Sequence, residues 1–112
     1  MLERRNSDRI AMPGGSVKEA NGDYLYSFRA MELSEEGIFL QGRLCHSGQE
    51  PFSSLSFTLP NGKRLNNVTA RIVREERKGA RQGCAFEFMN LSEEHRMTLK
   101  RFFAEFQLRG TA

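Results

Sequence analysis

The sequence predicts a mainly β domain, a small antiparallel barrel or sandwich followed by one amphipathic helix. Three observations support this fold class. Apolar and polar residues alternate with a period of two along most of the chain up to Met89, turn signals separate nearly all of these runs, and the periodicity becomes helical after Asn90. About six strands and one helix fit this pattern, without an internal repeat or a second domain.

Residues 1–9 are polar and lack the apolar periodicity that would place them in a core. The first predicted strand, residues 10–20, contains Pro13-Gly14-Gly15, which should bend or interrupt it. Asn21-Gly22-Asp23 is typical of a tight hairpin turn, because Asn-Gly readily accepts positive φ angles. The strand that follows carries its aromatic residues on one face, at Tyr24, Tyr26 and Phe28, with Ala30 beyond them.

A polar break at residues 32–37, closed by a glycine, predicts a turn into a short strand at 38–40. Residues 41–54, with two glycines, a proline and three serines, are expected to form a loop. Two further runs alternate on either side of a turn at residues 60–63: Leu55, Phe57 and Leu59 before it, and Val68, Ala70 and Ile72 after it.

The charged residues 74–82 predict a solvated hairpin, with the alternative that Arg74 or Arg81 extends a ligand-binding surface. In the last predicted strand Cys84, Phe86 and Phe88 should face the core, whereas Ala85, Glu87 and Met89 should face the other way.

The predicted helix begins after Ser92, a suitable N-cap, with two glutamates in its first turn. Gly110 is expected to end it. One apolar stripe should pack on the core through Leu99, Phe102, Phe103 and Phe106.

The composition limits the classes of function. The chain has 112 residues, enough for one core, with 38% hydrophobic and 28% charged residues. A net charge of +3 is too small to indicate nonspecific nucleic-acid binding. No apolar run approaches the roughly 20 residues of a membrane span, and the N-terminus has no hydrophobic signal region. We therefore expect a cytoplasmic protein with no membrane insertion.

Catalytic and metal-binding residues are not indicated. Cys45, His46, Cys84 and His95 have none of the spacings of a structural zinc site, so we expect no metal and no cofactor. Ser34 has no histidine or lysine at a recognisable spacing to activate it, and the carboxylates are spread over turns. The protein is therefore not expected to be an enzyme.

Two short sequence motifs stand out, one in the polar N-terminal arm and one in the polar break at residues 32–37. Arg5-Asn6-Ser7-Asp8-Arg9 matches an RxxxR element, and Glu32-Leu33-Ser34-Glu35-Glu36-Gly37 nearly matches a [D/N]xSxxG element. With the order of strands and the final helix, these motifs resemble the PilZ domain family over roughly residues 3 to 106. The resemblance implies a six-stranded antiparallel β-barrel with a C-terminal amphipathic helix at 10–109, a flexible arginine arm at 1–9, and binding of cyclic di-GMP, a bacterial second messenger.

The resemblance also implies a binding site. An arginine fork can meet guanine O6 and N7, or can stack on a base or pair with a phosphate. The opposite wall would be the 32–37 loop, where a carboxylate accepts from the guanine N1–H and N2–H₂ edge and a hydroxyl binds a polar ligand atom. The glycine would let the backbone turn tightly or approach the base without a Cβ clash. The expected ligand-binding residues are Arg4, Arg5, Arg9, Glu32, Ser34 and Gly37.

Several alternatives stay open. Arg4, Arg5 and Arg9 could form a solvated tail, and Ser34 could simply cap a turn. Glu32 stands where the family pattern has Asp or Asn, which suggests weakened recognition or a degenerate adaptor that acts only through protein contacts. In either case an unidentified protein effector is the expected partner. Nucleic acid is not expected, since the aromatic residues have core-facing spacings.

Overall fold

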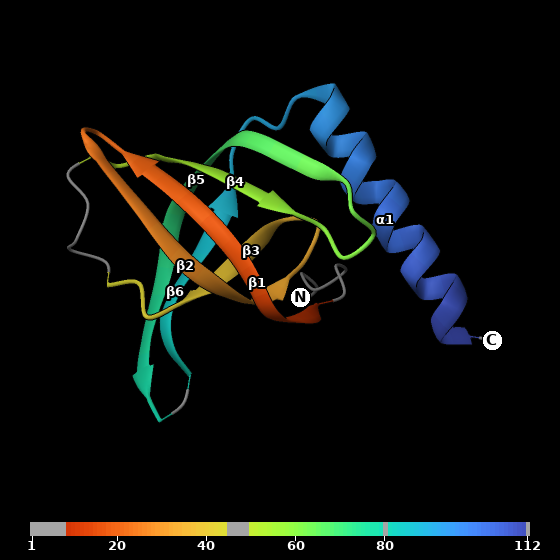
Figure 1. Cartoon of the computed structure of the whole chain (residues 1–112), viewed down its shortest axis with the longest axis horizontal. Helices are drawn as coiled ribbons and strands as arrows, with labels where there is room; N and C mark the ends of the chain where they lie inside the picture. The colour runs from red at the N-terminus through yellow and green to blue at the C-terminus, as the bar shows by residue number, and fades with distance from the viewer. Residues whose placement is uncertain (1–8, 45–49, 80, 112) are drawn as a thin grey trace, which may run out of the picture.

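The computed structural model describes residues 9–44, 50–79 and 81–111. Six antiparallel strands close into a barrel in the order β1-β2-β3-β6-β5-β4, and a single helix follows them (Figure 1). The predicted six-stranded antiparallel barrel with a C-terminal helix is therefore confirmed. The elements are β1 (Ile10–Asn21), β2 (Tyr24–Leu33), β3 (Gly37–Gln41), β4 (Ser53–Thr58), β5 (Arg64–Lys78), β6 (Arg81–Phe88) and α1 (Glu93–Thr111).

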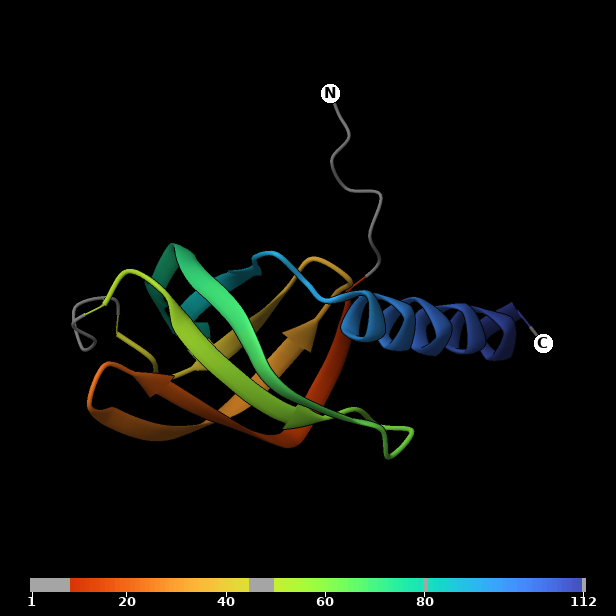
Figure 2. The ribbon, with the colours of Figure 1, turned by 90° about the horizontal axis from the view of Figure 1, so that it is seen from above.

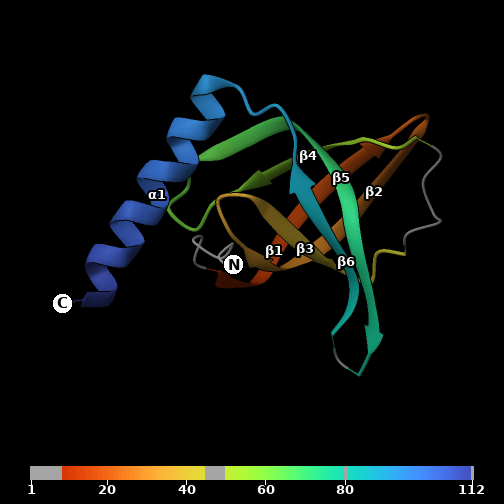
Figure 3. The same ribbon diagram turned by 180° about the vertical axis from the view of Figure 1, so that it is seen from behind.

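The strand ends agree with most of the predicted turns. The Asn21-Gly22-Asp23 turn joins β1 to β2, and Gly22 has a φ of +59° there. β1 is continuous, but its register against β2 shifts between Ala11 and Gly15, where the proline and glycines were expected to bend it. The charged run after Ile72 is part of the β5–β6 hairpin, because β5 continues as far as Lys78. This hairpin projects beyond the barrel wall (Figures 1 and 3).

The inward-facing side chains form one hydrophobic core. The faces predicted for β4, β5 and β6 are confirmed, because each of these alternating sets is buried or packs against the core. The helix lies at the end of the barrel opposite the tips of the β1–β2 and β5–β6 hairpins (Figures 1 and 2). It contributes three buried side chains to the core: Leu99, Phe102 and Phe103.

Two expectations for α1 were wrong. Phe106 was expected in the core, but it is 44% exposed, because the second half of the helix extends past the barrel (Figure 2). Gly110 was expected to end the helix, but α1 continues to Thr111, since a glycine weakens a helix by only about 1 kcal/mol and can adopt helical dihedral angles. The predicted N-cap is confirmed, with the Ser92 hydroxyl accepting the His95 backbone N–H at 3.0 Å. No helix among the described ranges is long and apolar enough to cross a membrane.

A buried ion pair lies at the end of the barrel far from the helix. Arg43 follows β3 and was expected in a loop, yet it is 1% exposed, and Glu19 of β1 is 0% exposed. The Arg43 Nε and Nη2 groups donate to the two Glu19 carboxylate oxygens at 2.6 and 2.7 Å. Arg43 also donates to the carbonyl of Leu44, and the Ser53 hydroxyl donates to Glu19. The fork is therefore bidentate, the strongest geometry for such a pair.

Aromatic rings enclose the same guanidinium group. The Arg43 Cζ atom lies 5.7–6.0 Å from the ring centres of Phe86, Tyr26 and Phe28. Burial on its own would lower the pKa of Arg43, but the hydrogen bond and the negative charge of Glu19 outweigh it and raise the pKa above its ordinary value. The Arg43 guanidinium therefore keeps its positive charge inside the barrel.

Removing one partner of this pair should destabilise the barrel strongly. We expect Arg43→Met to lower the free energy of unfolding by about 3–5 kcal/mol, because it leaves the Glu19 carboxylate buried without its counter-charge. Urea unfolding followed by circular dichroism would measure the change. The double variant Glu19→Leu/Arg43→Met, which removes both charges, should recover much of the loss. A single variant as stable as the wild type would contradict the assigned role.

Candidate functional site

The outer face of the barrel carries a row of side chains across four neighbouring strands. Glu32 of β2 pairs with Phe39 of β3, Phe39 pairs with Ala85 of β6, and Ala85 pairs with Arg74 of β5. Directly paired residues point to the same side of a sheet, so these four side chains share the outer face. The small Ala85 lies between larger neighbours, and the row is therefore hollow at its middle.

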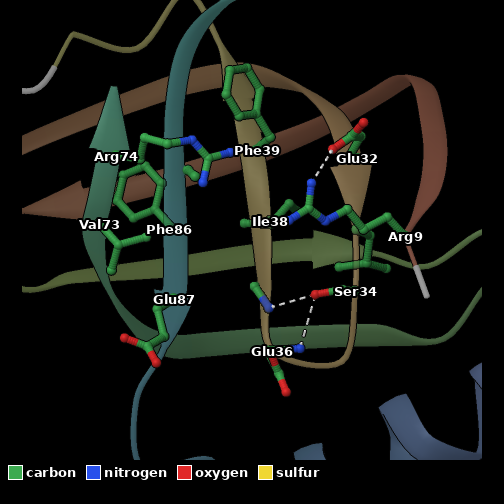
Figure 4. Close-up of a pocket in the computed structure, with 13 residues that line it drawn as sticks. Arg9, Glu32, Ser34, Glu36, Ile38, Phe39, Val73, Arg74, Phe86 and Glu87 are labelled. Atoms are coloured by element: carbon green, nitrogen blue, oxygen red, sulfur yellow. Dashed lines mark hydrogen bonds and ion pairs between the residues drawn. The ribbon is translucent and has the colours of Figure 1, made fainter. Parts of the chain in front are cut away.

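A pocket of about 340 Å³ opens over this row (Figure 4). This volume is at the lower end of the roughly 300–1,000 Å³ range of small-molecule sites. Phe39 is only 3% exposed although it alternates with the core residues Ile38 and Leu40. The pocket is lined by Arg9, Glu32, Leu33, Ser34, Glu36, Gly37, Ile38, Phe39, Val73, Arg74, Ala85, Phe86 and Glu87.

Two β-bulges orient the charged residues at the ends of this row. The register of β2 against β3 shifts between Ala30 and Glu32, and the register of β5 against β6 shifts between Ile72 and Arg74. Ala30 belongs to the core, and strict alternation would turn Glu32 inward as well. The extra residue in each strand instead turns Glu32 and Arg74 outward, as bulges commonly do beside functional sites.

The turn between β2 and β3 is held by Ser34. Its hydroxyl oxygen accepts the backbone N–H groups of Glu36 at 3.1 Å and Gly37 at 3.2 Å (Figure 4). The Ser34 backbone N–H donates to the Gly37 carbonyl at 2.9 Å. Ser34 therefore caps the turn as an acceptor, and its O–H group is a separate hydrogen-bond donor.

Position 37 requires glycine for a reason other than the two that the sequence suggested. Its φ angle is not among the positive ones, so the turn does not require glycine for its backbone conformation. A Cβ atom at this position would lie 2.1 Å from the backbone oxygen of Phe86. Glycine is required here because β3 and β6 approach each other closely at the edge of the pocket.

The charges around the pocket are partly paired. Arg9 lies 3.9 Å from Glu32, and both side chains are partly exposed, at 57% and 32%. An ion pair of this kind contributes less than about 1 kcal/mol. Arg74 donates to Glu76 at 2.9 Å, and Arg71 lies 3.2 Å from Glu87. Arg9, Glu32 and Ser34 lie on the β2–β3 side of the pocket, and Arg74 and Glu87 lie on the β5–β6 side (Figure 4).

Four of the six expected site residues, Arg9, Glu32, Ser34 and Gly37, line this one pocket. Arg4 and Arg5 lie outside the described residues. Of the two alternatives in the charged run, Arg74 lines the pocket, whereas the backbone of Arg81 is paired with that of Lys78 near the tip of the hairpin. The sequence interpretation missed Phe39 and Ala85, although their outward positions in alternating strands were the available signal.

Substituting Gly37 should disturb the barrel and the pocket together. We expect Gly37→Ala to lower the free energy of unfolding by about 1–3 kcal/mol, because the added methyl group pushes β3 away from the Phe86 carbonyl. Chemical denaturation would measure it, with Glu36→Ala as the control, since the Glu36 side chain is exposed. Equal stability of the two variants would show that the strands can separate at no cost.

Comparisons with known proteins identify a family and a fold. The model of the PilZ domain matches residues 3–105. The fold resembles that of Escherichia coli YcgR in complex with c-di-GMP, with a TM-score of 0.73, 18% sequence identity, and coverage of 98% of this chain and 49% of that one. It also resembles the Bacillus subtilis inhibitor of motility MotI/DgrA, with a TM-score of 0.74, 17% identity, and coverage of 96% and 53%.

The isolated PilZ domain of Escherichia coli YcgR with c-di-GMP is similar over 97% of both chains, with a TM-score of 0.62 and 20% identity. The present chain spans about half the length of the first two of these proteins. A search of curated proteins finds no match. Because the family model covers nearly the whole chain, the protein belongs to the PilZ domain family.

Proposed function

We propose that this protein is a receptor for cyclic di-GMP, with no catalytic activity of its own, which relays ligand binding to a protein partner. The observation that carries the proposal is the pocket itself, because the last arginine of the RxxxR element and the 32–37 motif line it together. The related structures of YcgR from Escherichia coli and PlzA from Borreliella burgdorferi contain c-di-GMP, which supports the choice of ligand.

The chemistry of the pocket suits a ligand with guanine bases and phosphates. Arg9 can direct a fork at guanine O6 and N7 or at a phosphate, and Arg5 and Arg4 of the proposed arm, residues 1–9, would add further cations. Glu32, which the sequence interpretation put on the wall opposite the arm, lies 3.9 Å from Arg9, and from there it can accept from the guanine N1–H and N2–H₂ edge. Ser34 keeps its turn hydrogen bonds while its O–H donates to a ligand oxygen.

The ion pair between Arg9 and Glu32 does not prevent either residue from binding a ligand. Arg9 and Glu32 are 3.9 Å apart and exposed to water, so separating them costs less than about 1 kcal/mol. Bidentate contacts to a ligand are stronger than such a pair. A segment that becomes ordered when a ligand binds is a common type of switch, and here the arm and the domain at 10–109 would present an altered surface to the partner.

The first test is a calorimetric titration with cyclic di-GMP. The wild type should bind, and Arg5→Ala and Arg9→Ala should each weaken binding at least about tenfold, since charge-assisted contacts are worth about 1.5–3 kcal/mol. Glu32→Asp should maintain or improve binding, because it restores the family pattern. Arg101→Ala, on the exposed face of α1, is the control and should bind like the wild type. Absence of heat at high micromolar ligand would overturn the proposal.

A second test addresses the floor of the pocket. Ala85→Leu should weaken cyclic di-GMP binding at least about tenfold, because the larger side chain fills the hollow between Phe39 and Arg74. Ala85 faces outward, so the unfolding midpoint should change little. Ala104→Leu is the matched control on an exposed part of α1. If Ala85→Leu bound the ligand normally, the site would have to lie elsewhere.

One observation favours a second candidate function, a PilZ adaptor that binds no nucleotide. Three carboxylates, Glu32, Glu36 and Glu87, line the pocket beside two arginines, and phosphates would meet this negative charge. Such an adaptor would capture its partner equally well with Arg5→Ala and Arg9→Ala in a pull-down, with or without cyclic di-GMP. A receptor should show capture that depends on the ligand.

A further inference from the structure

We infer that Arg74, on the side of the pocket opposite Arg9, is a specificity-determining residue. Its guanidinium donates to the O6 and N7 acceptors of one guanine. This inference rests on the proposed function and extends it to a residue outside the two family motifs. It assigns the discrimination between guanine and adenine partly to β5, a strand that neither motif contains.

The position of Arg74 is a built feature of the strand. Val68, Ala70 and Ile72 alternate on the core side of β5, so Arg74 would also face inward if the strand were regular. The bulge between Ile72 and Arg74 reverses this direction and places Arg74 opposite Ala85 on the pocket side. The bulge in β2 does the same for Glu32 at the other end of the same row. Both walls of the pocket are therefore oriented by the same device.

The side chain of Arg74 is held in a useful orientation. Its Nε–H donates to Glu76 at 2.9 Å, which fixes the stem of the side chain along β5. The guanidinium is turned toward Phe39 and the pocket (Figure 4). The two terminal nitrogens are the groups that a planar acceptor pair would meet. Anchoring one nitrogen reduces the conformational entropy that binding must remove.

The width of the row suits a ligand with two bases. The backbones of Glu32 and Arg74 are separated along the sheet by three inter-strand spacings, about 14 Å in total. Arg9 adjoins Glu32 at one end of this span, and Arg74 stands at the other. Between them Phe39 and Ala85 offer a low apolar floor. Cyclic di-GMP contains two guanines, and one guanidinium at each end can serve each of them.

The chemistry of the base edge makes the inference specific. Guanine presents two acceptors, O6 and N7, that an arginine fork can meet together. Adenine presents an N6–H₂ donor in place of O6, which an arginine cannot accept. Arg74 should therefore favour cyclic di-GMP over cyclic di-AMP, whereas a cation that only neutralised phosphates would bind both ligands alike.

The test compares the affinities of cyclic di-GMP and cyclic di-AMP, measured by competition with a fluorescent cyclic di-GMP analogue. Arg74→Ala should weaken cyclic di-GMP binding about 10- to 100-fold and change cyclic di-AMP binding less than about threefold. Arg74→Lys keeps the charge but not the fork, so it should not restore the preference for guanine.

Arg77→Ala is the matched control, because Arg77 also lies on β5, is exposed, and donates to a strand neighbour, Glu75, at 2.7 Å. It should keep both affinities. The inference is overturned if Arg74→Ala binds cyclic di-GMP normally, if it loses both ligands equally, or if Arg77→Ala shows the same loss. A wild type that binds neither ligand would instead overturn the proposed function, and with it this inference.

Discussion

The buried pair of Arg43 and Glu19 is the interaction on which the closed end of the barrel depends. It joins β1 to the segment that follows β3, and Ser53 at the start of β4 adds a third connection. Removing two charges from water costs several kcal/mol for each ion, and only complete pairing offsets this cost. Here the Glu19 carboxylate accepts from two of the three guanidinium nitrogens and from a hydroxyl, so this buried pair specifies how the segments meet.

This inner arrangement also fixes the outer face. Because successive side chains of a strand point to opposite faces, the short strand β3 carries Ile38 and Leu40 in the core and Phe39 on the pocket side. Phe86 packs its ring against Arg43 inside the barrel, and its backbone oxygen sets the closest approach of Gly37. The pocket is therefore a surface whose floor cannot move without repacking the core, as binding sites on strands generally require.

Local sequence patterns predicted the strands and the helix, because alternation and turn chemistry act over a few residues. They could not predict the pair of Arg43 with Glu19, since the two partners are 24 positions apart and one of them follows a strand in a polar segment. The available signal was that Glu19 lies two positions after Val17 in the same strand, so the two side chains point to the same, inward face. Phe106 shows the opposite error: its spacing fits the apolar stripe, but the helix is longer than the surface that it covers.

The part of the candidate site that lies in one contiguous motif was predictable from the sequence. The part that depends on which way a strand residue faces was not. Ser34 and Gly37 follow from six consecutive residues, but the outward direction of Arg74 depends on a bulge that period-two alternation cannot represent. Natural proteins tend to depart from regular local structure at their functional sites. The two bulges fit this rule, because both interrupt the pattern beside the same row of side chains. Glu32 gains its outward direction from one of them, and its carboxylate lies 3.9 Å from the Arg9 guanidinium, so the residue that departs from the family pattern is also the one that pairs with the last arginine of the RxxxR element.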